Sequence, residues 1–317
     1  GVVMIKFGTG GWRAIIGEEF TKENIQKLAL AMSLKIKAEH VEDKPVVIGY
    51  DRRFLSKEAV IWSCEILGQQ GIRVLFVDRS SPTPLIMFYV MKHDLSYGMM
   101  VTASHNPAIY NGIKVFTRGG RDADEHQTAD IEKYLEQAEK LYVPDPEENG
   151  QMPPHAYQEL VKSGRVVEMN PMNEYLDNII SLINLDAIRE RDLRIAIDPM
   201  YGVSLTALCT ILSIARCTVE TINSQHDTLF GGKMPAPTES TLRSLQNYVL
   251  DRYCDIGIAT DGDADRLGVI DDKGHYLHAN TILVMLYYYL LKYRGWRGPA
   301  VRNLSTTHVL DKVAESF

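Results

Sequence analysis

Two short polar segments combine side chains whose types and spacing could do chemistry. Residues 102–107 read Thr-Ala-Ser-His-Asn-Pro, and residues 261–266 read Asp-Gly-Asp-Ala-Asp-Arg. The first offers a hydroxyl nucleophile, and the second offers carboxylates together with an arginine. Each follows a short apolar stretch that we expect to be a strand, and open α/β sheets bind ligands beyond the carboxyl ends of their strands.

The first segment predicts a tight, exposed loop that carries Ser104 and His105. Asn106 precedes Pro107, and a residue before proline is biased away from helix. Such a loop would present a hydroxyl with a polar neighbour beside it. A Ser-His pair is also common in plain solvated turns, so this segment alone leaves its role open.

The second segment alternates acidic residues, which would place Asp261, Asp263 and Asp265 on one side of an extended loop. Like charges so close together repel unless a cation lies among them, and hard oxygen ligands of this kind suit Mg²⁺. Asp272 stands where an EF-hand calcium loop needs a glutamate, which disfavours that motif. Arg266 would offer a fork of donors to a phosphoryl group beside the metal. The alternative is a polar turn between strands.

A third segment, residues 7–13, reads Phe-Gly-Thr-Gly-Gly-Trp-Arg. Its glycines could let backbone N–H groups approach a phosphate, but the spacing is neither that of a P-loop nor that of a dinucleotide fingerprint. A flexible entry to the first domain explains it equally well. We expect Trp12 to pack in the core beside this segment.

Short apolar stretches alternate with segments of helical period along the whole chain, which predicts an α/β fold with mixed, mainly parallel sheets covered by helices. Strands are expected at 46–50, 73–77, 97–102, 112–116, 193–197, 218–222, 256–260 and 300–304, with a hairpin at 267–277. Helices are expected at 57–70, 128–141, 175–183, 204–212, 238–250, 281–293 and 307–316.

The distribution of turn-forming residues predicts how this pattern divides into domains. Residues 143–154 are rich in Pro, Glu, Asp and Asn, a composition that suits a linker. We therefore expect domains at 1–150 and 151–275. Residues 276–317 would begin a third domain that is incomplete, because one strand between two helices cannot bury its own edges.

Composition restricts the classes of partner. The 317 residues are 45% hydrophobic and carry a formal charge of -7, so no general positive field is present to attract nucleic acid or an anionic membrane surface. The four cysteines lack metal-binding spacing and are expected to be reduced core residues. With no basic and apolar leader pattern at the start, we expect a cytoplasmic protein.

The three segments together resemble the α-D-phosphohexomutase family of phosphoglucomutases and phosphomannomutases, as does Lys114 in Tyr-Asn-Gly-Ile-Lys. The resemblance implies four domains around a cleft, the first three being related α/β units. It implies conversion of hexose 1-phosphate to hexose 6-phosphate, with glucose as the expected sugar and a hexose 1,6-bisphosphate as activator.

The same resemblance assigns roles to individual residues. Ser104 would be the phosphoserine, whose phosphate completes a Mg²⁺ site with Asp261, Asp263 and Asp265. Lys114 would be the general acid or base. Surrounding the transferring phosphoryl group would be the side chains Arg13, His105 and Arg266.

Departures from the family pattern leave alternatives open. A Glu-x-Ser-Gly-His-like sugar loop and a fourth-domain phosphate loop are not found, so we expect a truncated chain with weak mutase activity. Ala264 stands where glycine is more common, a change the loop should tolerate. Two other functions are possible for these residues. One is a phosphatase or phosphotransferase that uses Ser104, and the other is a non-catalytic binding protein built from mutase domains. The identity of the hexose and the oligomeric state cannot be predicted from these residues.

Overall fold

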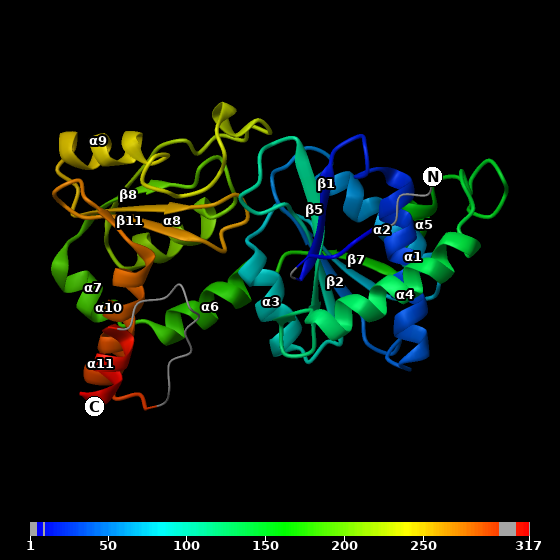
Figure 1. Ribbon diagram of the computed structural model, residues 1–317, viewed down its shortest axis with the longest axis horizontal. Helices are drawn as coiled ribbons and strands as arrows, with labels where there is room; N and C mark the ends of the chain where they lie inside the picture. The colour runs from blue at the N-terminus through cyan, green and yellow to red at the C-terminus, as the bar shows by residue number, and fades with distance from the viewer. Residues whose placement is uncertain (1–4, 9, 298–308, 317) are drawn as a thin grey trace.

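Two separate β-sheets, each covered by helices, organise the chain (Figure 1). The computed structural model describes residues 5–8, 10–297 and 309–316. We call the part built on the first sheet the first unit and the part built on the second sheet the second unit. This arrangement confirms the predicted α/β class with mixed, mainly parallel sheets.

The sheet of the first unit has the strand order β1-β5-β4-β2-β3-β7, and β6 pairs with β5. Strands β4, β2, β3 and β7 are parallel, whereas β5 and β1 are antiparallel to their neighbours. Both β2 and β4 are buried along their length, as expected for apolar strands covered on both faces. The strands are β1 (Gly11–Ile15), β2 (Val46–Tyr50), β3 (Val74–Val77), β4 (Tyr97–Val101), β5 (Tyr110–Thr117), β6 (Arg121–Asp122) and β7 (Val166–Met169).

Helices cover both faces of this sheet. On one face, α1, α2 and α4 enclose a large apolar core, and on the other face α3 encloses a smaller one around Ile86 and Met100. The side chain of Thr21 accepts a hydrogen bond from the Asn24 amide, which caps the start of α1. The helices are α1 (Lys22–Ala38), α2 (Ser56–Gln69), α3 (Thr83–Lys92), α4 (Glu125–Leu141) and α5 (Ala156–Lys162).

The second sheet has the order β12-β11-β10-β8-β9, in which β11-β10-β8-β9 repeats the arrangement of β5-β4-β2-β3 in the first sheet. Parallel strands β10, β8 and β9 are followed at one edge by antiparallel β11 and β12. The strands are β8 (Arg194–Asp198), β9 (Thr218–Thr221), β10 (Ile256–Thr260), β11 (Leu267–Ile270) and β12 (Tyr276–Leu277).

Helix α9 packs Leu245 and Val249 onto one face of the second sheet, while α8 packs beside α6 and next to β9. Helix α6 lies between the two units in Figure 1, and the ring of its Tyr175 is 5.6 Å from that of Phe88 on α3. The helices are α6 (Met172–Leu182), α7 (Leu185–Arg191), α8 (Leu205–Ile214), the 3-10 turn η1 (Phe230–Gly232), α9 (Arg243–Asp251), α10 (Ala279–Lys292) and α11 (Val309–Glu315).

The expected domain boundaries do not coincide with the points along the chain where the two sheets end. Strand β7 pairs in parallel with β3, so the first sheet extends beyond the boundary expected at residue 150. The polar segment 143–154 joins α4 to α5 within the first unit, and its Met152 is buried in the large core. Strand β12 belongs to the second sheet, so this sheet continues just past the boundary expected after residue 275. The strand expected at 300–304 lies outside the described residues.

The glycine-rich segment 7–13 is not simply a flexible entry to the first domain, because its second half is a strand. Residues Gly11–Ile15 form β1, which pairs antiparallel with β5. Trp12 is buried, as expected, and its ring centroid lies 5.5 Å from that of Phe20. The strand therefore fixes Arg13 opposite Gly112, next to the end of the Ser104 segment.

Within the ranges given above, none of the helices combines the length and apolar character needed to cross a membrane.

Candidate active site

Ser104 and the three aspartates lie on loops that occupy the same place in the two sheets. The Ser104 loop, residues 102–110, leaves β4 and ends on the first residue of β5. The aspartate loop, residues 261–266, leaves β10 and leads into β11. Each connects a parallel strand to its antiparallel neighbour, so both begin at the carboxyl end of a parallel strand, where ligands are expected.

The Ser104 loop holds its serine in an uncommon conformation. Ser104 has φ = 53°, in the left-handed region, which costs a non-glycine residue about 1–3 kcal/mol unless its surroundings compensate. Its amide donates to Thr102 Oγ1 at 2.9 Å, and the Thr102 hydroxyl donates to Asp51 Oδ2 at 2.6 Å. Asp51 is buried at the end of β2, so this chain of hydrogen bonds ties the loop to the core.

The structure brings the Ser104 side chain against the aspartate loop of the other unit. Ser104 Oγ donates to Asp261 Oδ2 at 3.0 Å, although the two residues are 157 positions apart. It also lies within hydrogen-bond distance of Asp265 Oδ1, at 3.3 Å. The two segments singled out in the sequence therefore form one site.

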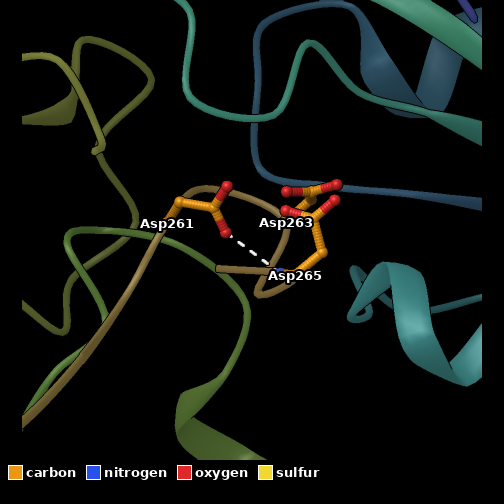
Figure 2. A group of neighbouring side chains, drawn as sticks. All are labelled: Asp261, Asp263 and Asp265. Carbon is orange, nitrogen blue, oxygen red and sulfur yellow. Dashed lines mark hydrogen bonds between the residues drawn. The ribbon is translucent and has the colours of Figure 1, made fainter. Parts of the chain in front are cut away.

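The three aspartates form a compact group (Figure 2), in which one oxygen from each lies within 4.8 Å of the others. Asp261 Oδ1 accepts the amides of Asp265 at 3.0 Å and Arg266 at 3.1 Å, which closes the loop around the group. Asp263 Oδ2 accepts from the Thr83 hydroxyl at 2.6 Å. Asp263 Oδ1 is buried and has no hydrogen-bond partner among the described residues.

Ionisation of this group is strongly perturbed. Burial, reinforced by the neighbouring carboxylates, raises the pKa of Asp261 to about 9 and that of Asp263 to about 6. Burial acts the same way on Asp265, but Lys114 outweighs it and lowers the pKa of that carboxyl to about 2. The carboxylates therefore need positive charge to ionise together. Hard oxygen ligands and the unpartnered Asp263 Oδ1 fit a divalent cation.

Lys114 comes to the same group from strand β5. Its Nζ lies 2.8 Å from Asp265 Oδ2 and 3.7 Å from Asp263 Oδ2. Burial opposes the charged form, but Asp263 and Asp265 outweigh burial and raise the pKa of Lys114. Lys114 is therefore an ammonium at neutral pH, placed across Asp265 from Ser104.

The remaining predicted residues surround the Ser104 loop. Arg13 donates to Asn106 Oδ1 at 2.6 Å. His105 Nδ1 is buried without a partner among the described residues, and burial lowers the pKa of His105, as do Arg266 and Arg13. The sequence-predicted residues are thus gathered at one site, in which Arg13 and Arg266 lie close enough to His105 to lower its pKa.

Sequence reasoning missed three supporting residues, Asp51, Arg53 and Thr83. Asp51 and Arg53 follow strand β2, and Thr83 begins helix α3 directly after a Ser-Ser-Pro turn. Their positions just beyond parallel strands β2 and β3 were the available signal, because the carboxyl ends of parallel strands meet at one edge of a sheet.

Two family models match these units. Residues 4–142 match the model described as Phosphoglucomutase/phosphomannomutase, alpha/beta/alpha domain I, and residues 173–274 match the one described as domain II. The chain belongs to the α-D-phosphohexomutase family.

Individual relatives agree with this assignment. A Pyrococcus abyssi protein that carries the name phosphoglucosamine mutase is 32% identical over 308 residues, covering 96% of this chain and 62% of the relative. A Thermococcus kodakarensis protein named phosphoglucomutase/phosphomannomutase is 28% identical over 312 residues, covering 98% of this chain and 64% of that one. A Thermus thermophilus crystal structure that carries the name phosphomannomutase superposes with a TM-score of 0.84 at 27% identity, covering 99% of this chain and 67% of that one. The chain thus spans less than two thirds of the curated relatives' length.

Proposed function

We propose that this protein interconverts hexose 1-phosphate and hexose 6-phosphate through a phosphoserine at Ser104 and a hexose 1,6-bisphosphate. One observation carries the proposal: the Ser104 hydroxyl of the first unit lies 3.0 Å from Asp261 and 3.3 Å from Asp265 of the second. A structural serine would not need an acidic cluster around its hydroxyl. A phosphorylated serine would need the cation that the cluster attracts.

The aspartates at 261, 263 and 265, with a phosphoserine oxygen, would hold Mg²⁺. When bound, this ion would neutralise the carboxylates and withdraw charge from the phosphoryl oxygens. Arg13, His105 and Arg266 are the proposed donors to the phosphoryl group on its open side. Fixed donors of this kind stabilise the charge that develops on the equatorial oxygens during transfer.

The reaction balances without an outside proton source. The free hydroxyl of the hexose phosphate attacks the phosphoryl group, a new P–O bond forms to the sugar, and the bond to Ser104 Oγ breaks. Lys114 gives its proton to the departing Ser104 oxygen and recovers one from the attacking hydroxyl. The bisphosphate then turns, and Ser104 takes back the other phosphoryl group by the reverse steps, which leaves the isomeric monophosphate.

The choice of hexose is open to direct test. Glucose was the sugar expected from the sequence, whereas the Pyrococcus abyssi relative carries the name phosphoglucosamine mutase. We therefore propose glucosamine phosphate as the first substrate to assay and glucose phosphate as the second.

Phosphoryl uptake is the step to measure, because it tests the Ser104 hydroxyl and its acidic neighbours directly. Purified protein is incubated with Mg²⁺ and hexose 1,6-bisphosphate, and intact mass followed by peptide mapping locates the added phosphoryl group. We expect one phosphoryl group, on Ser104. Ser104→Ala should take up none, while Ser163→Ala, a change at an exposed serine at the end of α5, should behave as wild type.

Different results lead to different conclusions. Phosphate on other residues, or none after prolonged exposure to the bisphosphate, would contradict the carrier role of Ser104. Rapid loss of the Ser104 phosphate to water in the presence of hexose phosphate, without formation of the isomer, would favour the phosphatase reading.

A further inference from the structure

Arg53 contacts the backbone of the Ser104 loop more extensively than any of the residues predicted from the sequence. One terminal nitrogen of its guanidinium donates to the carbonyls of Pro107 at 2.9 Å and Tyr110 at 3.1 Å. The other donates to the carbonyls of Ser104 at 2.8 Å and Asn106 at 2.7 Å. Arg53 is only 3% exposed, so these contacts are shielded from water.

The guanidinium is itself held on its remaining sides. Its Nε lies 3.4 Å from Asp51 Oδ2, and the Arg53 amide donates to Asp51 Oδ1 at 2.9 Å. The ring of Phe230, which belongs to the second unit, covers the guanidinium with its centroid 5.0 Å away. Asp51 also accepts a hydrogen bond from the Thr102 hydroxyl. Asp51 therefore binds the Ser104 loop at its start, and Arg53 binds it along its length.

Only arginine can make this set of contacts. Its planar guanidinium directs terminal N–H groups outward in a fixed fork, which matches carbonyls on two sides at once. A lysine ammonium has three donors and no fixed plane. Four carbonyls that accept from one buried cation also account for how Ser104 keeps a left-handed backbone conformation, with φ = 53°.

We infer that Arg53 is a positioning residue for phosphoryl transfer, which fixes the Ser104 loop so that the serine hydroxyl faces the aspartates. This inference rests on the proposed function of Ser104. Within the described part of the chain, Arg53 makes no hydrogen bond to the Ser104 hydroxyl or to the carboxylates of the aspartate loop, although its charge interacts with Asp261 and Asp263. Its hydrogen bonds therefore reach the serine only through the backbone.

The first measurement is the rate of Ser104 phosphorylation by hexose 1,6-bisphosphate with Mg²⁺. Arg53→Lys should slow it by about 100-fold, because a small displacement of a reacting group has an effect of that size. Arg53→Ala should be slower still and should recover in part when guanidinium ion is added at a concentration that leaves wild type unaffected. Arg52→Met is the matched control: Arg52 donates to Ser224 O at 3.0 Å, outside the loop, and this variant should stay within about threefold of wild type.

The second measurement is amide hydrogen exchange of the peptide that covers residues 102–110, which needs no activity. The amides of Ser104, Asn106 and Tyr110 are all hydrogen-bonded within the loop, and their exchange should accelerate in Arg53→Lys but not in Arg52→Met.

Wild-type rates of phosphorylation and of loop exchange in Arg53→Lys would overturn the inference. Failure of wild type to accept phosphate would instead refute the proposed function, and loop exchange would then decide alone whether Arg53 orders the Ser104 loop. Recovery of Arg53→Ala by guanidinium supports the inference, since global unfolding of the variant would not be reversed by a denaturing ion.

Discussion

The Ser104 loop and the aspartate loop begin at the same point of two similar sheets, yet they are held in different ways. In the first unit the strands run in the order β5-β4-β2-β3, and in the second they run β11-β10-β8-β9. The Thr102 amide donates to Gly112 O to close one loop, and the Asp261 amide pairs with Arg266 O to close the other. The topology is repeated, while the residues that fix each loop are not.

The Ser104 loop is fixed mainly from within its own unit, by Asp51 and Arg53. The aspartate loop has less support of that kind. It rests on the turn at Gly202, where an added Cβ would lie 2.8 Å from Gly262 O and 2.9 Å from Asp261 O. It is also held from the first unit, because the Thr83 amide donates to Asp263 O at 2.9 Å and the Thr83 hydroxyl to its carboxylate.

This difference separates two tasks. A loop that presents a hydroxyl at a fixed point gains from a rigid, self-contained support. In a loop that carries several carboxylates, the negative charges repel one another, and a cation together with contacts from the other unit offsets this repulsion. We therefore expect the first loop to be sensitive to changes in its own core, and the second to be sensitive to cations and to the contact between units.

The largest expected effect is that of Gly112→Ala in the first unit. A Cβ at Gly112 would lie 2.0 Å from Trp12 O and 3.0 Å from Thr102 O, both backbone atoms that cannot move without separating β1 from β5. We expect the free energy of unfolding to fall by about 3 kcal/mol or more. Urea unfolding measures it, with Gly8→Ala as the control, since a Cβ there would meet only Gly11 O at 3.8 Å. Equal losses in the two variants would show that the close approach does not matter.

Metal removal should affect the second unit nearly as strongly. Mg²⁺ at 100 times its dissociation constant should raise the free energy of unfolding by about 3 kcal/mol, and EDTA should reverse this. Asp261→Asn should lose that response and be about as stable as wild type in EDTA, because the Asp261 carboxyl, with its pKa raised to about 9, is already uncharged at neutral pH and the asparagine oxygen can still accept the Asp265 and Arg266 amides.

Thermal unfolding with and without Mg²⁺ tests this prediction. Asp186→Asn, at an exposed aspartate on α7, is the control and should keep the full Mg²⁺ response. An unchanged response in Asp261→Asn would place the cation elsewhere.

A smaller effect is expected at the contact between units. Thr83→Val keeps the volume of the side chain but removes the hydroxyl that donates to Asp263 at 2.6 Å. We expect Mg²⁺ affinity to fall about tenfold, the size associated with losing a hydrogen bond to a charged group. Thr83→Ser should retain most of the affinity in titration calorimetry. A matching loss in both variants would indicate that packing, and not the hydroxyl, supports the loop.

The smallest effect is expected at Asp94, which lies between α3 and β4. Hydrogen bonds from Lys44 and Arg118 lower the pKa of Asp94 from its ordinary value of 3.8. Because the folded pKa is below the unfolded one, the stabilisation is present above pH 3.8 and is lost as pH falls through the folded value. Asp94→Asn should therefore be slightly less stable than wild type near neutral pH and equal to it in acid, with Ser104 phosphorylation unchanged. A change in phosphorylation would show that the Ser104 loop is not independent of this surface.

Local patterns allowed much of the fold to be predicted. Strands β4 and β10 are short, largely apolar stretches, and the segments that follow them are short and polar, so both loops could be located before their partners were known. The first sheet continues past the boundary expected near residue 150 because β7 joins it through β3, a pairing between distant segments that no local pattern reports. Strand β1 was missed because the glycines that precede and begin it resemble a loop, and pairing with β5 overrides that preference.

The sequence by itself determined the chemical groups: a serine on one strand-end loop, alternating carboxylates on another, and a lysine that follows the first. Only the tertiary structure decided that Ser104 faces Asp261, that Arg53 grips the serine loop, and that Thr83 reaches Asp263 from the other unit. The physical reason is that residue type and spacing act over a few neighbours, whereas these contacts join segments far apart in the sequence, within the first unit for Arg53 and between the two units for Ser104 and Thr83. Residues that position the reacting groups are therefore the ones the sequence could not reveal.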